Sequence, residues 1–344
     1  MKNYHFPRSI KRNYTTFAKI IDTYAYLPDK IITNNDIIAS TGLKVTDQAI
    51  QKTVGVKERR QAAVGKSDSD LLLQAATGCL SQAGIEASQL SKIIVNKFVG
   101  DKLLPMTASM LQAKLHCPMA VQSFDIDGGM NSFLQSFEIA ANMINCGDKY
   151  ILIVSGGIIN PFININDARH QFLFGDAATA LLLGPSKKRH ILATYQFSNY
   201  DYIEKAIGFQ VRKNTKQNCH ITRRQELSDL YKIEDWTNTI PFIKMALKQT
   251  VDSLVEQANT TRNEIDLLLV TEYNQNIRDA IIESSGISKN KSLSILHKYG
   301  NTLSASLPLL IQEAKSGNRL KKDTLIMMLS LGEGISGGGI LYNC

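Results

Sequence analysis

The chain has 344 residues, of which 44% are hydrophobic and 20% are charged, and its formal net charge is +8. This length and composition support a large buried core, indicate two domains or one duplicated unit, and exclude disordered, collagen-like and disulfide-rich proteins. The five cysteines have neither CxxC spacing nor Cys/His ligand spacing, so we expect free thiols and no metal site.

No segment of the sequence predicts a membrane or secretory protein. The longest apolar runs, such as Tyr150–Gly156 and Thr324–Leu331, are too short to cross a bilayer. Basic residues near the N-terminus have no apolar stretch behind them, as a secretory signal would require. We therefore expect a cytoplasmic protein with no membrane partner.

Five basic residues gather between residues 212 and 224. They are Arg212, Lys213, Lys216, Arg223 and Arg224. Two interpretations stay open: a solvated face, or a docking surface for an acidic macromolecule. No basic patch interleaved with aromatic residues occurs, so we expect no nucleic acid partner.

The first half of the chain alternates helical and strand patterns. From Asp68 to Leu80 apolar residues recur at helical spacing, which predicts a helix with one buried stripe. Ile85–Val95 has the pattern of a polar helix end and a short strand, and Val121–Phe133 that of a strand, a glycine turn and a helix start. Buried strands are predicted at Lys149–Ser155 and Ala177–Leu183. The alternation predicts an α/β protein.

The second half repeats these patterns in the same order. The repeated segments are Thr260–Val270, Leu293–Ala305, Asp323–Ser330 and Gly337–Tyr342. Continuous apolar runs of this kind suit strands that helices cover on both faces. The repeat predicts a duplicated unit with an N-terminal half at residues 1–186 and a C-terminal half at 187–344. The pattern fades between about residues 197 and 238, which we interpret as a loop-rich insertion.

Two glycine-containing turns occupy equivalent places in the two halves. They are Gly128-Gly129-Met130 and Gly300-Asn301-Thr302. A strand that ends in a sharp turn before a helix exposes the turn residue and offers backbone N–H groups. We expect these turns to face each other across one pocket, although the glycines could also serve only tight turns and close packing.

Five segments, in order along the chain, resemble the ketoacyl-acyl-carrier-protein synthase III family of the thiolase superfamily. They are Thr53–Arg60, Phe124–Phe133 (the family's nucleophile turn), Phe174–Ala180, Tyr299–Pro308 (its asparagine motif) and Leu331–Gly338 (its C-terminal glycine loop). The resemblance implies a thiolase fold, in which duplication gives five αβαβα layers with two mixed sheets. It also implies a decarboxylative condensation that uses a cysteine thiolate, oxyanion donors and a histidine–asparagine pair.

Carried over residue by residue, the resemblance puts a methionine where the family has its catalytic cysteine. A thioether such as that of Met130 has no proton to lose and cannot accept an acyl group. The histidine position falls in Val270–Asn276, where the candidates are Thr271, Glu272 and Tyr273. Asn301 retains the family's asparagine. The oxyanion loop is Gly332, Glu333 and Gly334, and we expect the Glu333 carboxylate to crowd or oppose an oxyanion.

The positions that contact coenzyme A in the family are also changed. The tryptophan that stacks on the adenine falls at Ala49, and its neighbouring arginine falls near Thr53. Arg169 lies within one residue of another coenzyme-contacting arginine and is our substrate-binding candidate, unless it caps a surface loop. We expect no bound cofactor, while coenzyme A or a carrier-bound acyl thioester stays open as a substrate.

These substitutions favour a silent subunit of a synthase dimer, in fatty acid or specialised polyketide metabolism. The partner would be a second copy or an active synthase III-like subunit, and an acyl carrier protein is a further possible partner. Lys102–Thr107 matches a dimer-contact segment of the family and could reach into a partner's pocket. Two alternatives stay open: an acyltransferase, thioesterase or related enzyme that uses other groups, and a non-catalytic acyl- or carrier-binding module. Cys79 and Cys146 are expected in helices, and His297 at a strand end.

Overall fold

The computed structural model describes residues 16–102, 104–127, 129–163, 168–199, 208–209, 231–232 and 239–344. The first sheet has the strand order β1–β7–β6–β4–β5. These strands are β1 (Phe17–Tyr26), β7 (Ala177–Ser186), β6 (Ile151–Gly157), β4 (Lys92–Asn96) and β5 (Gln122–Asp125). β7 runs antiparallel to both β1 and β6, whereas β4 is parallel to β6 and β5, so the sheet is mixed.

The second sheet has the strand order β11–β12–β13–β8. Its strands are β11 (Leu267–Val270), β12 (Leu325–Gly332), β13 (Ser336–Asn343) and β8 (Ile191–Ser198). β11 and β12 are parallel, and the other two pairs are antiparallel. From β8 to β11 this sheet therefore repeats β1, β7, β6 and β4 with the same relative directions, as a duplicated unit predicts. The assignment of two domains that meet at residue 186 stays a prediction.

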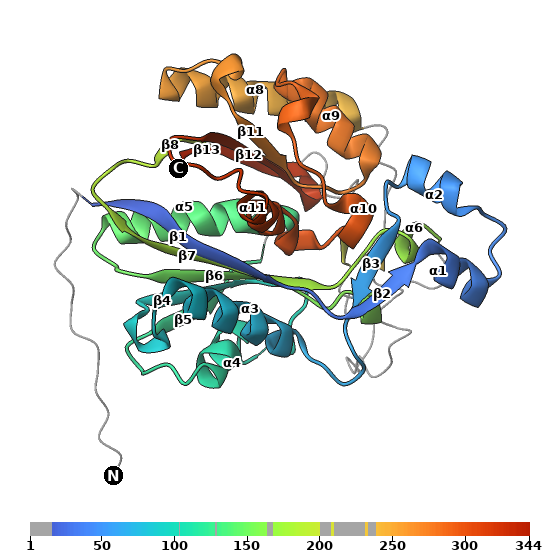
Figure 1. Cartoon of the computed structure of the whole chain (residues 1–344), viewed down its shortest axis with the longest axis horizontal. Coiled ribbons are helices and arrows are strands. Elements are labelled where there is room, and N and C mark those ends of the chain that lie inside the picture. Colours follow the sequence, from blue (N-terminus) through green and yellow to red (C-terminus); the bar gives the residue numbers. More distant parts are fainter. Residues whose placement is uncertain are drawn as a thin grey trace, which may run out of the picture.

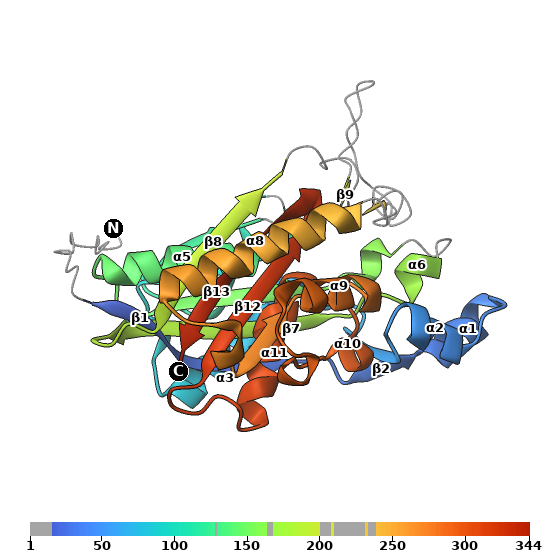
Figure 2. The same ribbon diagram turned by 90° about the horizontal axis from the view of Figure 1, so that it is seen from above.

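Helices enclose and separate the two sheets in five layers (Figure 1), which lie over one another in the view from above (Figure 2). The helices are α3 (Asp68–Ala83) and α4 (Thr107–Lys114) outside the first sheet, α5 (Ser132–Asn145) and α11 (Ser306–Ser316) between the sheets, and α8 (Ile240–Ala258) and α9 (Gln275–Ser285) outside the second. The predicted αβαβα thiolase fold is confirmed. The helix predicted from Asp68 to Leu80 is α3, and the apolar positions of its predicted stripe are buried.

Shorter elements complete the described chain. The helices are α1 (Asn34–Thr41), α2 (Asp47–Thr53), α6 (Ala168–Gln171) and α10 (Leu296–Tyr299); the small sheets pair β2 (Lys30–Thr33) with β3 (Glu58–Gln61) and β9 (Gly208–Phe209) with β10 (Tyr231–Lys232). The 3₁₀ turns are η1 (Ala87–Gln89), η2 (Gly129–Asn131), η3 (Asn160–Phe162), η6 (Arg262–Glu264), η7 (Lys289–Lys291), η8 (Leu303–Ala305) and η9 (Glu333–Ile335). Most of the predicted insertion, including its five basic residues, lies outside the described residues.

One predicted strand is replaced by a helix. The segment that begins at Leu293 was expected to form a strand equivalent to β5, but an isolated parallel bridge between Leu268 and Ser292 is followed by α10. The backbone there bonds to side chains instead of to β11: Arg278 donates to the Leu293 carbonyl, and the Ile295 N–H donates to a glutamate. The expectation that His297 ends a strand is therefore wrong, because this residue lies in α10.

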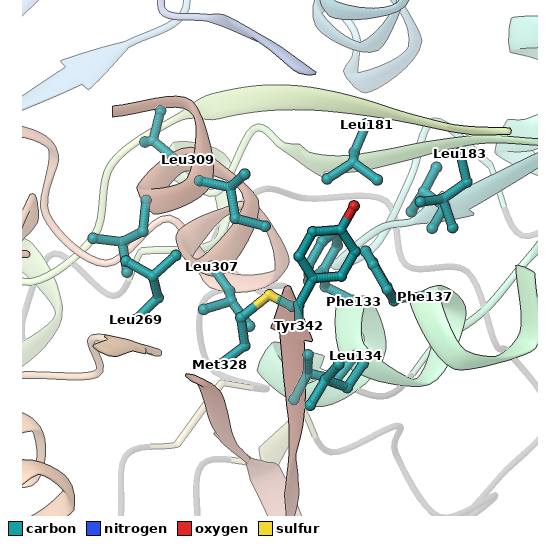
Figure 3. Close-up of a cluster of buried hydrophobic side chains, with 14 of the residues drawn as sticks. Phe133, Leu134, Phe137, Leu181, Leu183, Leu269, Leu307, Leu309, Met328 and Tyr342 are labelled. Carbon is teal, nitrogen blue, oxygen red and sulfur yellow. The ribbon is translucent and has the colours of Figure 1, made fainter. Parts of the chain in front are cut away.

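An aromatic cluster between the sheets joins the two halves (Figure 3). Phe137 of α5 contacts Phe133 at a ring-centroid distance of 6.0 Å and Tyr342 of β13 at 6.2 Å, both edge-on. The Tyr342 hydroxyl accepts a hydrogen bond of 2.9 Å from the Ile20 N–H in β1. Edge-to-face pairs stabilise beyond the area they bury, so this cluster holds the layers in register.

Candidate functional site

The turn between β5 and α5 carries Met130 in η2. Its backbone is fixed from two sides: the Ser132 hydroxyl donates to the Gly129 carbonyl at 2.7 Å, and the Ser330 hydroxyl of β12 donates to the Met130 carbonyl at 3.2 Å. Gly129 has a φ of +56°, a conformation that glycine adopts without a steric cost. Met130 is 2% exposed, so its side chain is inside the protein.

Asn301 lies in the equivalent turn of the second half and is completely buried. Its N–H donates to the Leu173 carbonyl at 2.8 Å, and its own carbonyl accepts from the Gly175 N–H at 3.1 Å. Its side-chain Oδ1 accepts from the Leu303 N–H at 2.8 Å. These bonds fix the direction of the amide and leave its Nδ2 group facing the other turn.

The two turns contact each other, as the sequence predicts. Asn301 Nδ2 lies 3.8 Å from Met130 Sδ, within the range of a weak hydrogen bond to a thioether. The histidine–asparagine chemistry of the resembling family needs this amide to face a reacting group. Here it faces a sulfur that carries two carbon substituents.

Glu333 enters the same site from η9. Its Oε2 accepts a hydrogen bond of 2.9 Å from the Met130 N–H. Its Oε1 is buried and has no hydrogen-bond partner among the described residues. Burial raises the pKa of this carboxyl above its usual range, against the opposing effect of the N–H groups of Met130 and of Glu333 itself. The Glu333 carboxylate therefore lies against the backbone of the Met130 turn, and its effect on an oxyanion stays a prediction.

The three candidates at the histidine position have different surroundings. The Thr271 hydroxyl accepts from the Leu331 N–H at 3.0 Å and so joins β11 to β12. Glu272 forms a buried ion pair at 2.7 Å with Arg278 Nε and accepts from a backbone N–H at 2.8 Å. Burial raises the pKa of Glu272, although Arg278 opposes this. Glu272 could act as an acid or base only if its side chain faced the two turns. The ion pair instead directs this carboxylate toward Arg278 in α9.

Tyr273 differs from its two neighbours because it packs in the same apolar cluster as Met130. It is 4% exposed, and the cluster also includes Leu303, Leu331 and Ile335. The assignment of the histidine position to one of these three residues stays a prediction. Ser330, whose hydroxyl donates to the Met130 carbonyl, was not predicted as a site residue. The sequence shows only a small polar residue just before the glycine loop at this position.

The structure describes the remaining predicted residues to different extents. Ala49 and Thr53 are exposed on α2. Arg169 belongs to α6, and its side chain lies outside the described part of the structure, as does Gly128; Gly334 lies in η9 beside Glu333. Cys79 is buried in α3, and burial raises the pKa of its thiol to about 12, which makes it a poor nucleophile.

The expectations about Cys146, metal sites and membrane spans concern only the residues that the structure describes. Cys146 follows the last residue of α5 and caps its C-terminus. Within these ranges no group of three or more histidine, cysteine or acidic side chains has a metal-binding arrangement. No helix in the same ranges has both the length and the apolar character that a membrane span requires.

The loop before α4 is held by buried charges. Asp125 accepts the N–H groups of Thr107 and Ala108 at 3.0 and 2.7 Å and pairs with Lys97 at 2.8 Å. The loop carries Leu104, which is 79% exposed, next to a cis peptide bond to Pro105. The predicted contact segment Lys102–Thr107 therefore presents an apolar side chain on a fixed base.

Two mixed sheets in an αβαβα stack, with turns of both halves meeting at one buried site, define a thiolase-fold protein. Residues 124–199 match the family model "3-Oxoacyl-[acyl-carrier-protein (ACP)] synthase III", and residues 255–344 match the model of its C-terminal part. The chain belongs to the ketoacyl-acyl-carrier-protein synthase III family.

Individual proteins agree with this assignment. The chain is 28% identical to beta-ketoacyl-[acyl-carrier-protein] synthase III of Xylella fastidiosa, over 94% of this chain and 98% of the relative. It is 29% identical to the protein of the same description from Natranaerobius thermophilus, with the same two coverages. The crystal structure of 3-oxoacyl-[acyl-carrier-protein] synthase III from Aquifex aeolicus superposes with a TM-score of 0.83 at 27% identity, covering 95% of this chain and all of that one.

Proposed function

We propose that this chain is a non-condensing member of its family that acts as the silent subunit beside an active, cysteine-bearing synthase III-like subunit. The observation that carries the proposal is the buried Met130 thioether, whose sulfur lies 3.8 Å from the retained Asn301 amide. A thioether sulfur has no proton to release, and acyl transfer to it would leave a sulfonium instead of a thioester. The position of the family's nucleophile is therefore occupied by a group that cannot perform the first step.

The retained asparagine has a structural use that does not require catalysis. Asn301 bonds through its backbone to Leu173 and Gly175, and through its side chain to Leu303. The two backbone bonds do not depend on the side chain, but replacing the amide would leave the buried Leu303 N–H without its acceptor, which is costly. The presence of Asn301 is therefore consistent with a protein that keeps the family's fold but does not catalyse condensation.

The loop Lys102–Thr107 supports the role as a partner subunit. Its exposed Leu104 is carried on a base that the Lys97–Asp125 ion pair and the α4 N-terminus hold in place. We propose that this apolar side chain enters the active subunit and helps to form its acyl pocket. An acyl carrier protein would be bound by the active subunit or by both.

The test is co-expression of the tagged chain with a cysteine- and histidine-bearing paralogue from the same genome, followed by native mass spectrometry. We expect a heterodimer with condensing activity that depends on the paralogue's cysteine. Leu104→Asp should weaken assembly, whereas Val64→Asp, at a fully exposed apolar position elsewhere, should not. Exclusive homodimers would contradict the silent-subunit role, and turnover of acyl thioesters by the isolated chain would instead favour an enzyme.

A further inference from the structure

We infer that Glu333 is a second block on acyl-thioester chemistry in this site, independent of the missing thiol, because its carboxylate occupies the N–H group that an acyl carbonyl would need. This inference rests on the proposed function and deepens it, since it names the class of substrate that the site rejects and the residue that rejects it. It predicts that a cysteine at position 130 alone does not restore acylation.

Two features of the structure describe the placement of the carboxylate. The first is the 2.9 Å hydrogen bond from the Met130 N–H to Glu333 Oε2. The second is steric: a Cβ atom added to Gly129 would lie 1.5 Å from the same Oε2 and 2.5 Å from the carboxyl carbon. The carboxylate is thus packed directly on the backbone of the turn, in space that only glycine leaves open.

The N–H concerned is the one that acyl transfer would use. In such a step the sulfur of a thiolate attacks the thioester carbonyl carbon, a new C–S bond forms, and the carbonyl oxygen becomes an oxyanion. The oxyanion then collapses, the C–S bond to coenzyme A breaks, and the departing thiolate takes up the proton that the attacking thiol had lost. Backbone N–H groups at the nucleophile turn stabilise the oxyanion, and removing one such donor slows catalysis by about 10²–10³.

Glu333 cannot easily yield this donor to a substrate. Its Oε1 has no hydrogen-bond partner within the described residues, so a carboxyl displaced from the Met130 N–H would keep only the N–H of Glu333 itself as a donor in the interior. Both the ionised and the neutral carboxyl accept from an N–H, so protonation does not release it. An acyl oxygen would also meet the negative charge of the ionised form.

The experiment compares Met130→Cys with the double variant Met130→Cys/Glu333→Gly. Each protein is incubated with acetyl-coenzyme A, and acetylation of the new cysteine is followed by intact-protein mass spectrometry. Alkylation of the same cysteine by iodoacetamide is measured in parallel, and the acetylation rate is divided by the alkylation rate to correct for access. We expect the ratio to be about 100-fold higher in the double variant.

Met130→Cys/Glu333→Gln is the matched control, because its amide oxygen keeps the size of the side chain and still accepts from the N–H at position 130. We expect it to stay as slow as Met130→Cys alone. Equal ratios in the single and Glu333→Gly variants, including zero in both, would overturn the inference. Failure of the proposed function is a different result, since it would appear as exclusive homodimers or as condensation by the unmodified chain.

Discussion

Gly129→Ala tests the position of the Glu333 carboxylate through protein stability. The substitution forces an L-residue into a left-handed conformation, which costs about 1–2 kcal/mol. It also places a methyl group 1.5 Å from Glu333 Oε2, and overpacking of this kind costs a further ~1–3 kcal/mol. The free energy of unfolding should therefore fall by about 2–5 kcal/mol.

The two costs can be separated by a double-mutant cycle. In a Glu333→Ala background the methyl group has no carboxylate to meet, so Gly129→Ala should cost only about 1–2 kcal/mol. Gly84→Ala provides the backbone cost alone, because Gly84 has a φ of +64° and no atom within 4 Å of an added Cβ. Urea unfolding followed by circular dichroism gives each value. Additive effects at Gly129 and Glu333 would refute the placement of the carboxylate.

Two further predictions concern buried carboxylates. Burial and nearby acidic groups raise the pKa of Asp68 from 3.8 to about 6, so the folded protein binds this proton more tightly than the unfolded chain does. The stability that this proton contributes is complete below pH 3.8 and is lost as pH rises through 6, a fall of about 3 kcal/mol in the free energy of unfolding. Asp68→Asn should remove this fall. If urea unfolding gave the wild type and Asp68→Asn parallel profiles of stability against pH, the prediction would be wrong. Glu272→Ala should lower the free energy of unfolding by ~3–5 kcal/mol, because it leaves the Arg278 charge buried without its partner. Adding Arg278→Met to that variant should recover part of the loss. A fall below about 1 kcal/mol for Glu272→Ala would show that the ion pair is not needed.

Most of the fold could be predicted because its signals are local in the sequence. Apolar runs gave β6, β12 and β13 nearly at their observed positions, and the repeat of motif order predicted two equivalent sheets. The segment after Leu293 was not predictable in this way. Its apolar pattern suits a strand, but Arg278 and Glu272 bond to its backbone from distant positions, and such bonds leave no trace in a local pattern.

In the candidate site, too, some features could be predicted from the sequence and others depend on contacts between distant residues. Met130 and Asn301 could be paired from motif order, because equivalent turns of a duplicated fold meet at one place. The register at the histidine position could not be resolved from the sequence, since neighbouring side chains at a strand end point in different directions. The bond from Met130 N–H to Glu333 likewise depends on how closely two halves approach, which motif spacing does not specify.

The most direct test of the account is whether the unmodified chain accepts an acyl group. The purified protein is incubated with acyl-coenzyme A and malonyl-acyl carrier protein beside a cysteine-bearing family member, and adducts and products are read by intact-protein and product mass spectrometry. We predict neither an acyl adduct nor a ketoacyl product from this chain, because the sulfur of Met130 cannot form a thioester. An acyl adduct on any residue of the site, or a ketoacyl product formed without the active family member, would contradict it.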